Sequence, residues 1–76
     1  MKEKLLQVLN DIRPDIDFEK AEKLIDSGVL DSFDVIQVVL ELNEKFDIEI
    51  QVEDLQPENL NDIQAMMTLI TRLQSE

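Results

Sequence analysis

The chain contains no cysteine, histidine, tryptophan or tyrosine. Without cysteine, neither a disulfide nor a thiolate metal site can stabilise the fold. Without histidine, the commonest general base and the commonest metal ligand are both missing. A serine or threonine hydroxyl therefore has no histidine to activate it, and we do not expect a self-contained enzyme.

Positive charge is also scarce, because 7 lysines and arginines face 18 aspartates and glutamates, for a net charge of −11. The excess is uneven: residues 26–62 hold eleven acids and one base, Lys45. This charge argues against nucleic acid or an anionic membrane as a partner and favours basic protein surfaces. No apolar run approaches the roughly 20 residues of a membrane span. The first residues lack the apolar stretch of a signal peptide, so we expect a cytoplasmic protein.

Hydrophobic residues make up 43% of the 76 positions, which suffices for one small core and one domain over residues 1–76. Apolar periodicity predicts helices over residues 3–12, 32–46 and 62–74. A shorter helical turn is expected over 53–56, and residues 14–31 are expected to form a long loop with a helical turn near 21–25. Residues 47–52 alternate like a strand but have no partner strand, so we expect an extended connector. The predicted fold is all-α, a small bundle of three main helices plus one short helix.

The helix predicted over residues 32–46 has two apolar faces. Its core face consists of Val35, Val38, Val39, Leu42 and Phe46. Its second face consists of Phe33, Ile36, Gln37, Leu40, Glu41 and Glu44. A helix with one buried side does not need a second apolar stripe, so this face either packs against a loop or the last helix, or binds another protein.

Several polar residues are placed where they can cap the predicted helices. Either Asp31 or Ser32 can cap the helix over 32–46, and Asn61 with Gln64 fits a capping box for the last helix.

Asp15 opens a segment that resembles a calcium loop. Its sixth position is a lysine rather than a glycine and its twelfth is an aspartate rather than a glutamate, so we expect no dedicated metal site. Hydrolysis by a carboxylate pair would need a cleft that so short a chain can hardly build.

Four segments together resemble the acyl carrier protein family. The run Gly28-Val-Leu-Asp-Ser32, at the start of a helix, resembles the family's signature, in which an Asp-Ser pair opens the second helix. The other matching segments are Glu44-Lys-Phe46-Asp-Ile-Glu-Ile50, Glu53-Asp-Leu55 and Pro57-Glu-Asn-Leu60. The resemblance covers nearly the whole chain.

This resemblance implies that a separate phosphopantetheinyl transferase attaches 4′-phosphopantetheine from coenzyme A to Ser32. Acyl or aminoacyl groups are then carried as thioesters on this covalent arm, whose thiol replaces the cysteine that the chain lacks. A phosphodiester at a helix N-terminus suits the free N–H groups and the dipole there. By family analogy, Asp31 helps the transferase to position its metal ion. The second face of the helix is then the docking surface for basic patches on partner enzymes, and the carrier itself is a non-catalytic monomer.

The resemblance leaves the cargo open. Phe33 and Gln37 replace the leucine and the acid of many fatty-acid carriers. The run Gly28-Val-Leu-Asp-Ser-Phe33 also lacks the Gly-Ala-Asp-Ser wording common in fatty-acid carriers. The chain looks closer to the D-alanyl carrier and other stand-alone carriers that work with an adenylate-forming ligase. Acyl-transfer or synthase enzymes with basic docking patches are the alternative partners. Some apolar residues could line an acyl pocket, although each is better explained as core. These residues are Leu42, Ile50, Leu55 and Ile63.

An alternative function is an unmodified acidic helical adaptor or regulatory subunit that binds basic protein surfaces. Ser32 is then a plain helix cap, and partner binding does not depend on its hydroxyl. Ser27 follows another aspartate but precedes Gly28 inside the loop, so we expect it to form a turn.

Overall fold

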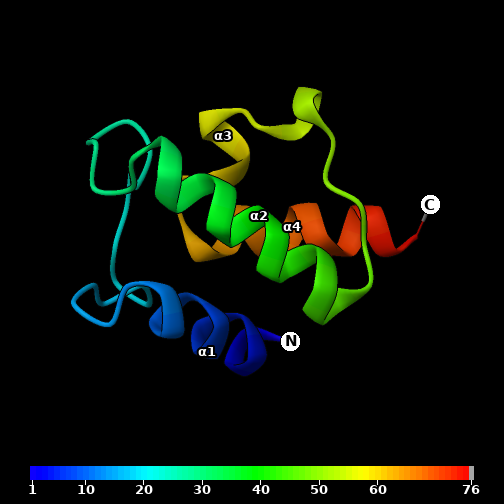
Figure 1. Cartoon of the computed structure of the whole chain (residues 1–76), viewed down its shortest axis with the longest axis horizontal. Coiled ribbons are helices and arrows are strands. Elements are labelled where there is room, and N and C mark those ends of the chain that lie inside the picture. Colours follow the sequence, from blue (N-terminus) through cyan, green and yellow to red (C-terminus); the bar gives the residue numbers. More distant parts are fainter. Residues whose placement is uncertain (76) are drawn as a thin grey trace.

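The computed structural model describes residues 1–75, and over that range it is helical, with no strand (Figure 1). The elements are α1 (Lys2–Ile12), α2 (Ser32–Phe46), the 3₁₀ helix η1 (Val52–Asp54), α3 (Pro57–Leu60) and α4 (Ile63–Gln74). Helix α1 packs against α2 and α4, and α3 packs against α4. The predicted all-α fold is confirmed. Within the described residues, no helix has the length and apolar character needed to cross a membrane.

The predicted helix boundaries agree closely with those of the three long helices. Helix α1 ends at Ile12 because Arg13 precedes a proline, and a residue before proline avoids the helical region. Helix α2 spans the predicted residues 32–46 and ends at Asp47, which adopts the left-handed conformation with φ 53°. Residues 48–51 form neither helix nor strand and bury Ile50, as expected of a connector.

One core joins side chains from all four α-helices and from the long loop. The three long helices supply most of it, including Leu69 of α4, and Phe18 and Leu24 of the loop are also buried. The buried apolar residues are Leu5, Val8, Leu9, Phe18, Leu24, Leu30, Val38, Leu42, Phe46, Ile50, Leu60, Ile63, Met66, Leu69 and Ile70. Burying the loop's apolar side chains fixes its path beside the helices.

The long loop before α2 is held by hydrogen bonds rather than by helix. The helical turn predicted near 21–25 does not form as a helix: the backbone instead makes hydrogen-bonded turns between Lys23 and Gly28. Lys23 has φ 54° and Gly28 has φ 81°, and these left-handed values interrupt any helix there. Ser27 lies in this turn, as predicted, and its N–H donates to the Lys23 carbonyl at 2.8 Å.

Two predictions about the last third of the chain need correction. Asn61 does not cap the last helix, because Asp62 does so by accepting a bond from the Ala65 N–H at 2.7 Å. The Asn61 side chain instead accepts bonds from the N–H groups of Ile25 (3.0 Å) and Asp26 (3.2 Å), and so fixes the long loop against α3. The turn predicted over 53–56 forms as η1 over Val52–Asp54, and the four-residue helix α3 was not predicted.

Candidate functional site

Ser32 is the first residue of α2, and its side chain is exposed. Of the two predicted caps, Asp31 is the one used: its backbone is extended and its Oδ1 accepts a bond from the Asp34 N–H at 2.8 Å. The Asp34 carboxylate in turn accepts the Asp31 N–H at 3.4 Å, which completes a capping box. Because Asp31 performs the capping, the Ser32 hydroxyl is left free for chemistry.

The surroundings of Ser32 suit a covalently attached anion with an extended arm. Helix α2 has 15 residues, so its aligned peptide dipoles place partial positive charge beside Ser32. Ser32 also borders a shallow groove of about 530 Å³. The lining residues are Ile25, Gly28, Leu30, Asp31, Ser32, Val35, Ile36 and Leu55. A phosphodiester on the serine oxygen would therefore meet the helix terminus, with a largely apolar groove next to it.

Leu55 belongs to this groove rather than to the core, with 39% of its surface exposed. The expectation that it is core is therefore wrong. The other three residues considered as core or as an acyl pocket, Leu42, Ile50 and Ile63, are buried as expected.

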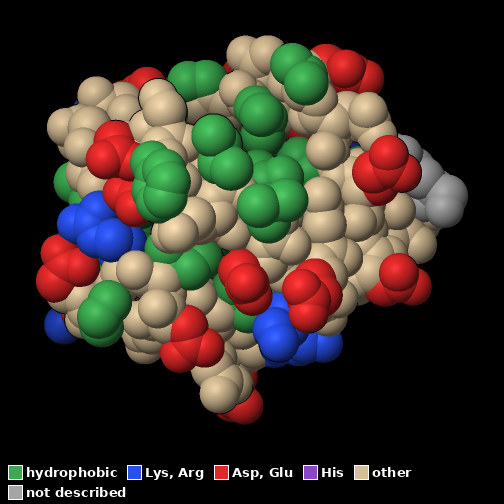
Figure 2. All heavy atoms as spheres, viewed as in Figure 1, with side chains coloured by type: hydrophobic (Ala, Val, Ile, Leu, Met, Phe, Trp, Pro, Cys, Tyr) green, Lys and Arg blue, Asp and Glu red, His purple; other side chains and the backbone are tan. Residues whose placement is uncertain are grey.

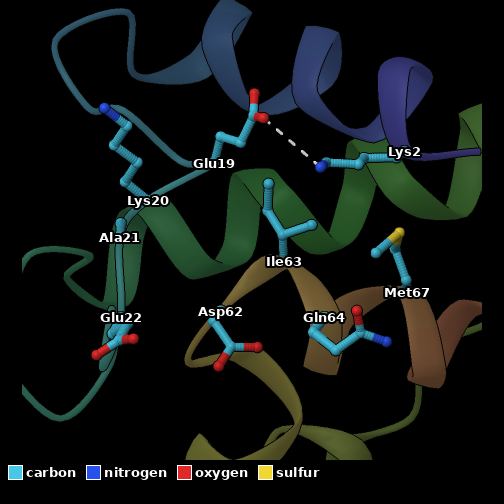
Figure 3. Close-up of a pocket in the computed structure, with 9 residues that line it drawn as sticks. All are labelled: Lys2, Glu19, Lys20, Ala21, Glu22, Asp62, Ile63, Gln64 and Met67. Atoms are coloured by element: carbon cyan, nitrogen blue, oxygen red, sulfur yellow. Dashed lines mark ion pairs between the residues drawn. The ribbon is translucent and has the colours of Figure 1, made fainter.

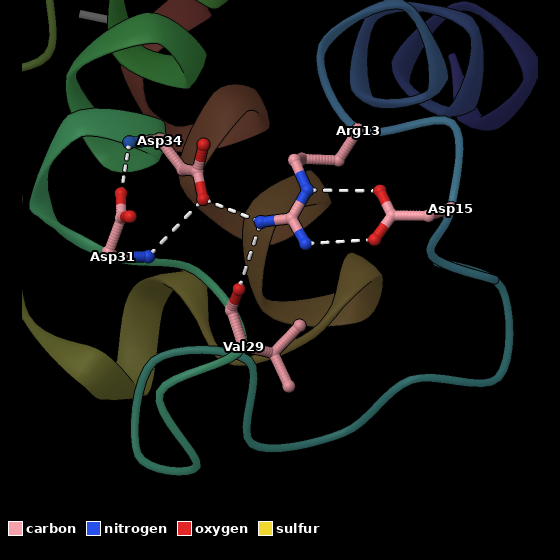
Figure 4. A network of polar contacts seen from close by, with 5 residues as sticks. All are labelled: Arg13, Asp15, Val29, Asp31 and Asp34. Carbon is pink, nitrogen blue, oxygen red and sulfur yellow. Dashed lines mark hydrogen bonds and ion pairs between the residues drawn. The ribbon is translucent and has the colours of Figure 1, made fainter.

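Arg13 binds the segments on both sides of Ser32 (Figure 4). Its Nη1 donates to the Val29 carbonyl at 3.1 Å and to Asp34 Oδ2 at 2.7 Å. Its Nε and Nη2 donate to the two carboxylate oxygens of Asp15 at 3.0 and 2.9 Å. Asp34 is the one charged residue that is buried among those described, and a buried carboxylate needs such a cation. Arg13 could not be identified from the sequence, because its partner Asp34 lies 21 positions away and no local pattern joins the two residues.

These contacts also shift two ionisation equilibria. Hydrogen bonds to Asp15 and then to Asp34 raise the pKa of Arg13 above its already high ordinary value. The same guanidinium lowers the pKa of Asp15 below its usual 3.8, mainly through their hydrogen bonds. Arg13 and Asp15 are therefore both charged at neutral pH.

The predicted second face of α2 is exposed. Phe33, Ile36 and Leu40 are 65%, 57% and 63% exposed, so packing against a loop or the last helix is excluded for these side chains. Glu44 is exposed, whereas Gln37 and Glu41 are half-buried. Figure 2 shows hydrophobic side chains gathered on the face where α2 lies in front, with acidic side chains around them. This combination has the apolar centre and polar rim of a protein-binding surface.

A different groove, of about 230 Å³, lies where α1, the long loop and the start of α4 meet (Figure 3). It is lined by both acids and bases, including Lys2 and Glu19, whose side chains pair at 3.6 Å. It shares no lining residue with the groove at Ser32. Because this groove carries charges of both signs and none of its polar side chains is buried, it does not indicate any particular class of ligand. Over residues 1–75, no three carboxylates are gathered closely enough to hold a metal ion.

Comparisons with known proteins agree with this geometry. A family model described as "Phosphopantetheine attachment site" matches residues 2–70. The D-alanyl carrier protein of Lactobacillus acidophilus is 30% identical to this chain over 76 residues, covering 99% of this chain and 96% of that protein. The D-alanyl carrier protein of Lactobacillus helveticus is 29% identical, and that of Streptococcus gordonii 25%, over the same shares.

Proposed function

The chain belongs to the family of phosphopantetheine-bearing carrier proteins, and on that premise we propose that Ser32 is the residue that bears the arm. Members of this family are non-catalytic, and their cofactor is covalent 4′-phosphopantetheine. When bound, this group supplies the thiol to which an acyl or aminoacyl group is attached. The position of the Ser32 hydroxyl carries the proposal, because it is exposed, not used for capping and placed at the N-terminus of a long helix.

Each neighbouring residue has a distinct role in this proposal. The Ser32 oxygen would attack the pantetheine-side phosphorus of coenzyme A, so that the pyrophosphate bond breaks, adenosine 3′,5′-bisphosphate leaves and the hydroxyl proton passes to the transferase. The helix N-terminus would stabilise the phosphodiester that results. Asp31 holds the first turn of α2 through Oδ1 and, by family analogy, helps to position the transferase's metal ion. We propose that residues 1–76 form a single carrier domain, since one core joins side chains from Leu5 to Ile70.

The proposal also assigns the exposed face of α2 to partner enzymes. Its apolar side chains provide contact area, and the acids around them select basic patches and speed encounter. The partners are the transferase itself and the enzymes that load the arm and receive its cargo. The residues of this docking face are Phe33, Ile36, Gln37, Leu40, Glu41 and Glu44.

A small aminoacyl group is the cargo that the observations favour. The names of the relatives support it, since all those cited are D-alanyl carriers. The interior beside the first half of α2 supports it as well, because the side chains there are packed so closely that no water molecule fits between them. The residues around that space are Ile25, Leu30, Val35, Val38, Leu60 and Met66. A long acyl chain could enter only if these side chains moved apart, whereas a D-alanyl group needs no such pocket.

The attachment site is tested by co-expression with a broad-specificity phosphopantetheinyl transferase, followed by intact mass. We expect the wild type and Ser27→Ala to gain one phosphopantetheinyl group and Ser32→Ala to gain none. Ser27 is the matched control because it also follows an aspartate and is exposed. A gain that survives Ser32→Ala would place the arm elsewhere, and no gain in the wild type would favour the unmodified adaptor.

The cargo is tested on the modified protein with ATP and one of two adenylate-forming ligases. One ligase is specific for D-alanine and the other for a long-chain fatty acid, and each is supplied with its own substrate. We expect a mass increase with the D-alanine ligase and none with the fatty-acid ligase. Loading with the fatty acid alone would overturn the aminoacyl assignment without affecting the assignment of Ser32.

A further inference from the structure

Arg13 is half-buried and forms more hydrogen bonds than an exposed arginine usually does. Its side chain is 29% exposed, and the Asp34 carboxylate that it meets is 12% exposed. Helix capping alone would require only the bonds between Asp31 and Asp34. The additional bonds from Nη1 to Asp34 and to the Val29 carbonyl therefore do something other than cap α2.

These bonds hold the chain at two points that enclose Ser32. One is the backbone of Val29, three residues before the serine, and the other is the side chain of Asp34, two residues after it. Asp15 holds the guanidinium in place from the other side with two parallel bonds, so its planar fork has a fixed direction (Figure 4). The end of α1, the end of the loop and the first turn of α2 thus meet at one side chain.

Arg72 provides a useful contrast within the same molecule. Its Nη2 donates to Asp54 Oδ1 at 2.8 Å, and that carboxylate is 14% exposed, close to the exposure of Asp34. This pair joins η1 to α4, and among the described residues neither side chain forms a hydrogen bond or ion pair with residues 29–34. The two arginine–aspartate pairs therefore share their chemistry and the burial of the carboxylate, although the Arg72 side chain is 52% exposed and that of Arg13 29%. They differ in what they hold.

We propose that Arg13 is a positioning residue for Ser32, which fixes the backbone on both sides of the serine so that its hydroxyl is presented to the transferase in a reactive geometry. This inference rests on the proposed attachment at Ser32. Arg13 does not touch the reacting atoms and acts through Val29 and Asp34. Since small misplacements of a nucleophile slow transfer strongly, loss of Arg13 lowers kcat more than it raises KM.

The test compares Arg13→Gln with Arg72→Gln in a transferase assay with coenzyme A, at a temperature where both proteins are folded. Each change removes one positive charge. Arg13→Gln removes the pairs with Asp15 and Asp34, and Arg72→Gln removes the pair with Asp54. We expect Arg13→Gln to lower kcat by roughly tenfold with KM within about twofold of wild type. Arg72→Gln should leave kcat unchanged while lowering the melting temperature. An unchanged kcat in Arg13→Gln, or an equal loss in both variants, would overturn the proposal.

A second pair of variants covers the case in which Arg13→Gln does not fold. Arg13→Lys keeps the charge that Asp34 needs but loses the fork that reaches Asp15, Val29 and Asp34 together. We expect it to fold and still to lose several-fold in kcat, whereas Arg72→Lys keeps the wild-type value. A wild-type kcat in Arg13→Lys would overturn the proposal. Failure of the wild type to accept the arm would refute the attachment at Ser32 itself, which is a separate outcome.

Discussion

The two apolar faces of α2 have similar side chains and opposite surroundings. Leu42 lies on one face and is 0% exposed, whereas Leu40 lies on the other and is 63% exposed. Val38 and Phe46 accompany Leu42 in the core, which also contains side chains of α1 and α4. Phe33 and Ile36 accompany Leu40 at the surface. Hydrophobicity alone therefore does not decide which face of this helix is buried.

The difference follows from the size of the molecule and from what each face can contact. A chain of 76 residues forms one small core, and one side of α2 is buried by packing against α1 and within the core that it shares with α4. Burying the opposite side would need another layer of structure. Its apolar side chains remain beside acids, an arrangement that suits reversible contact with another protein better than a permanent interior.

The largest effect that tests this contrast is on stability. Leu42→Ala creates a cavity in the core and should lower the free energy of unfolding by about 2–5 kcal/mol. Leu40→Ala removes the same atoms from an exposed position and should change it by less than about 0.5 kcal/mol. Urea unfolding followed by circular dichroism measures both. Similar losses in the two variants would mean that the faces are not energetically distinct.

A smaller effect concerns the exposed face and its partners. Ile36→Ala should raise the KM for the transferase about tenfold, which corresponds to about 1.4 kcal/mol of binding, and leave kcat and stability nearly unchanged. This pattern is the reverse of the one expected for Arg13. Ile36→Leu is the control, because it keeps the apolar contact area. If Ile36→Ala has the wild-type KM, this residue lies outside the surface that the transferase contacts.

Much of this contrast could be predicted from the sequence, because its causes are local. The periodicity of residues 32–46 and the short-range pair Asp31 and Asp34 determine where α2 begins and which residues share a side. The same information separates Leu42 from Leu40 before any packing is known. Whether Asp31 or Ser32 caps this helix could not be decided from the sequence, because both side chains can accept the bond, and the structure assigns the cap to Asp31.

The errors arise where distant residues decide the outcome. Asn61 and Asp62 are equally good caps by type, and the choice depends on the bonds that Asn61 makes with residues 25–26, some 35 positions away. Helix α3 has four residues, too few to show a helical period. Leu55 looks like core in the sequence, but it borders the groove beside Ser32.

The smallest effect concerns Asp47, which ends α2 and belongs to neither face. Its φ of 53° costs a residue with a side chain some free energy, and glycine adopts this conformation freely. Asp47→Gly should therefore raise the free energy of unfolding by about 0.5 kcal/mol. Asp47→Asn removes the charge alone, so comparing the two variants separates backbone strain from relief of acidic repulsion.

Asp47→Gly also sharpens the comparison of the two faces. Because the change acts on the end of the helix, it should raise the stability of Leu42→Ala and Leu40→Ala alike. The difference between those two variants should then persist within about 0.5 kcal/mol, as expected for sites that do not share contacts. A difference that shrinks in the Asp47→Gly background would show that the end of α2 and its buried face are coupled. The core position of Leu42 would then depend on how the helix terminates as well as on which residues it faces.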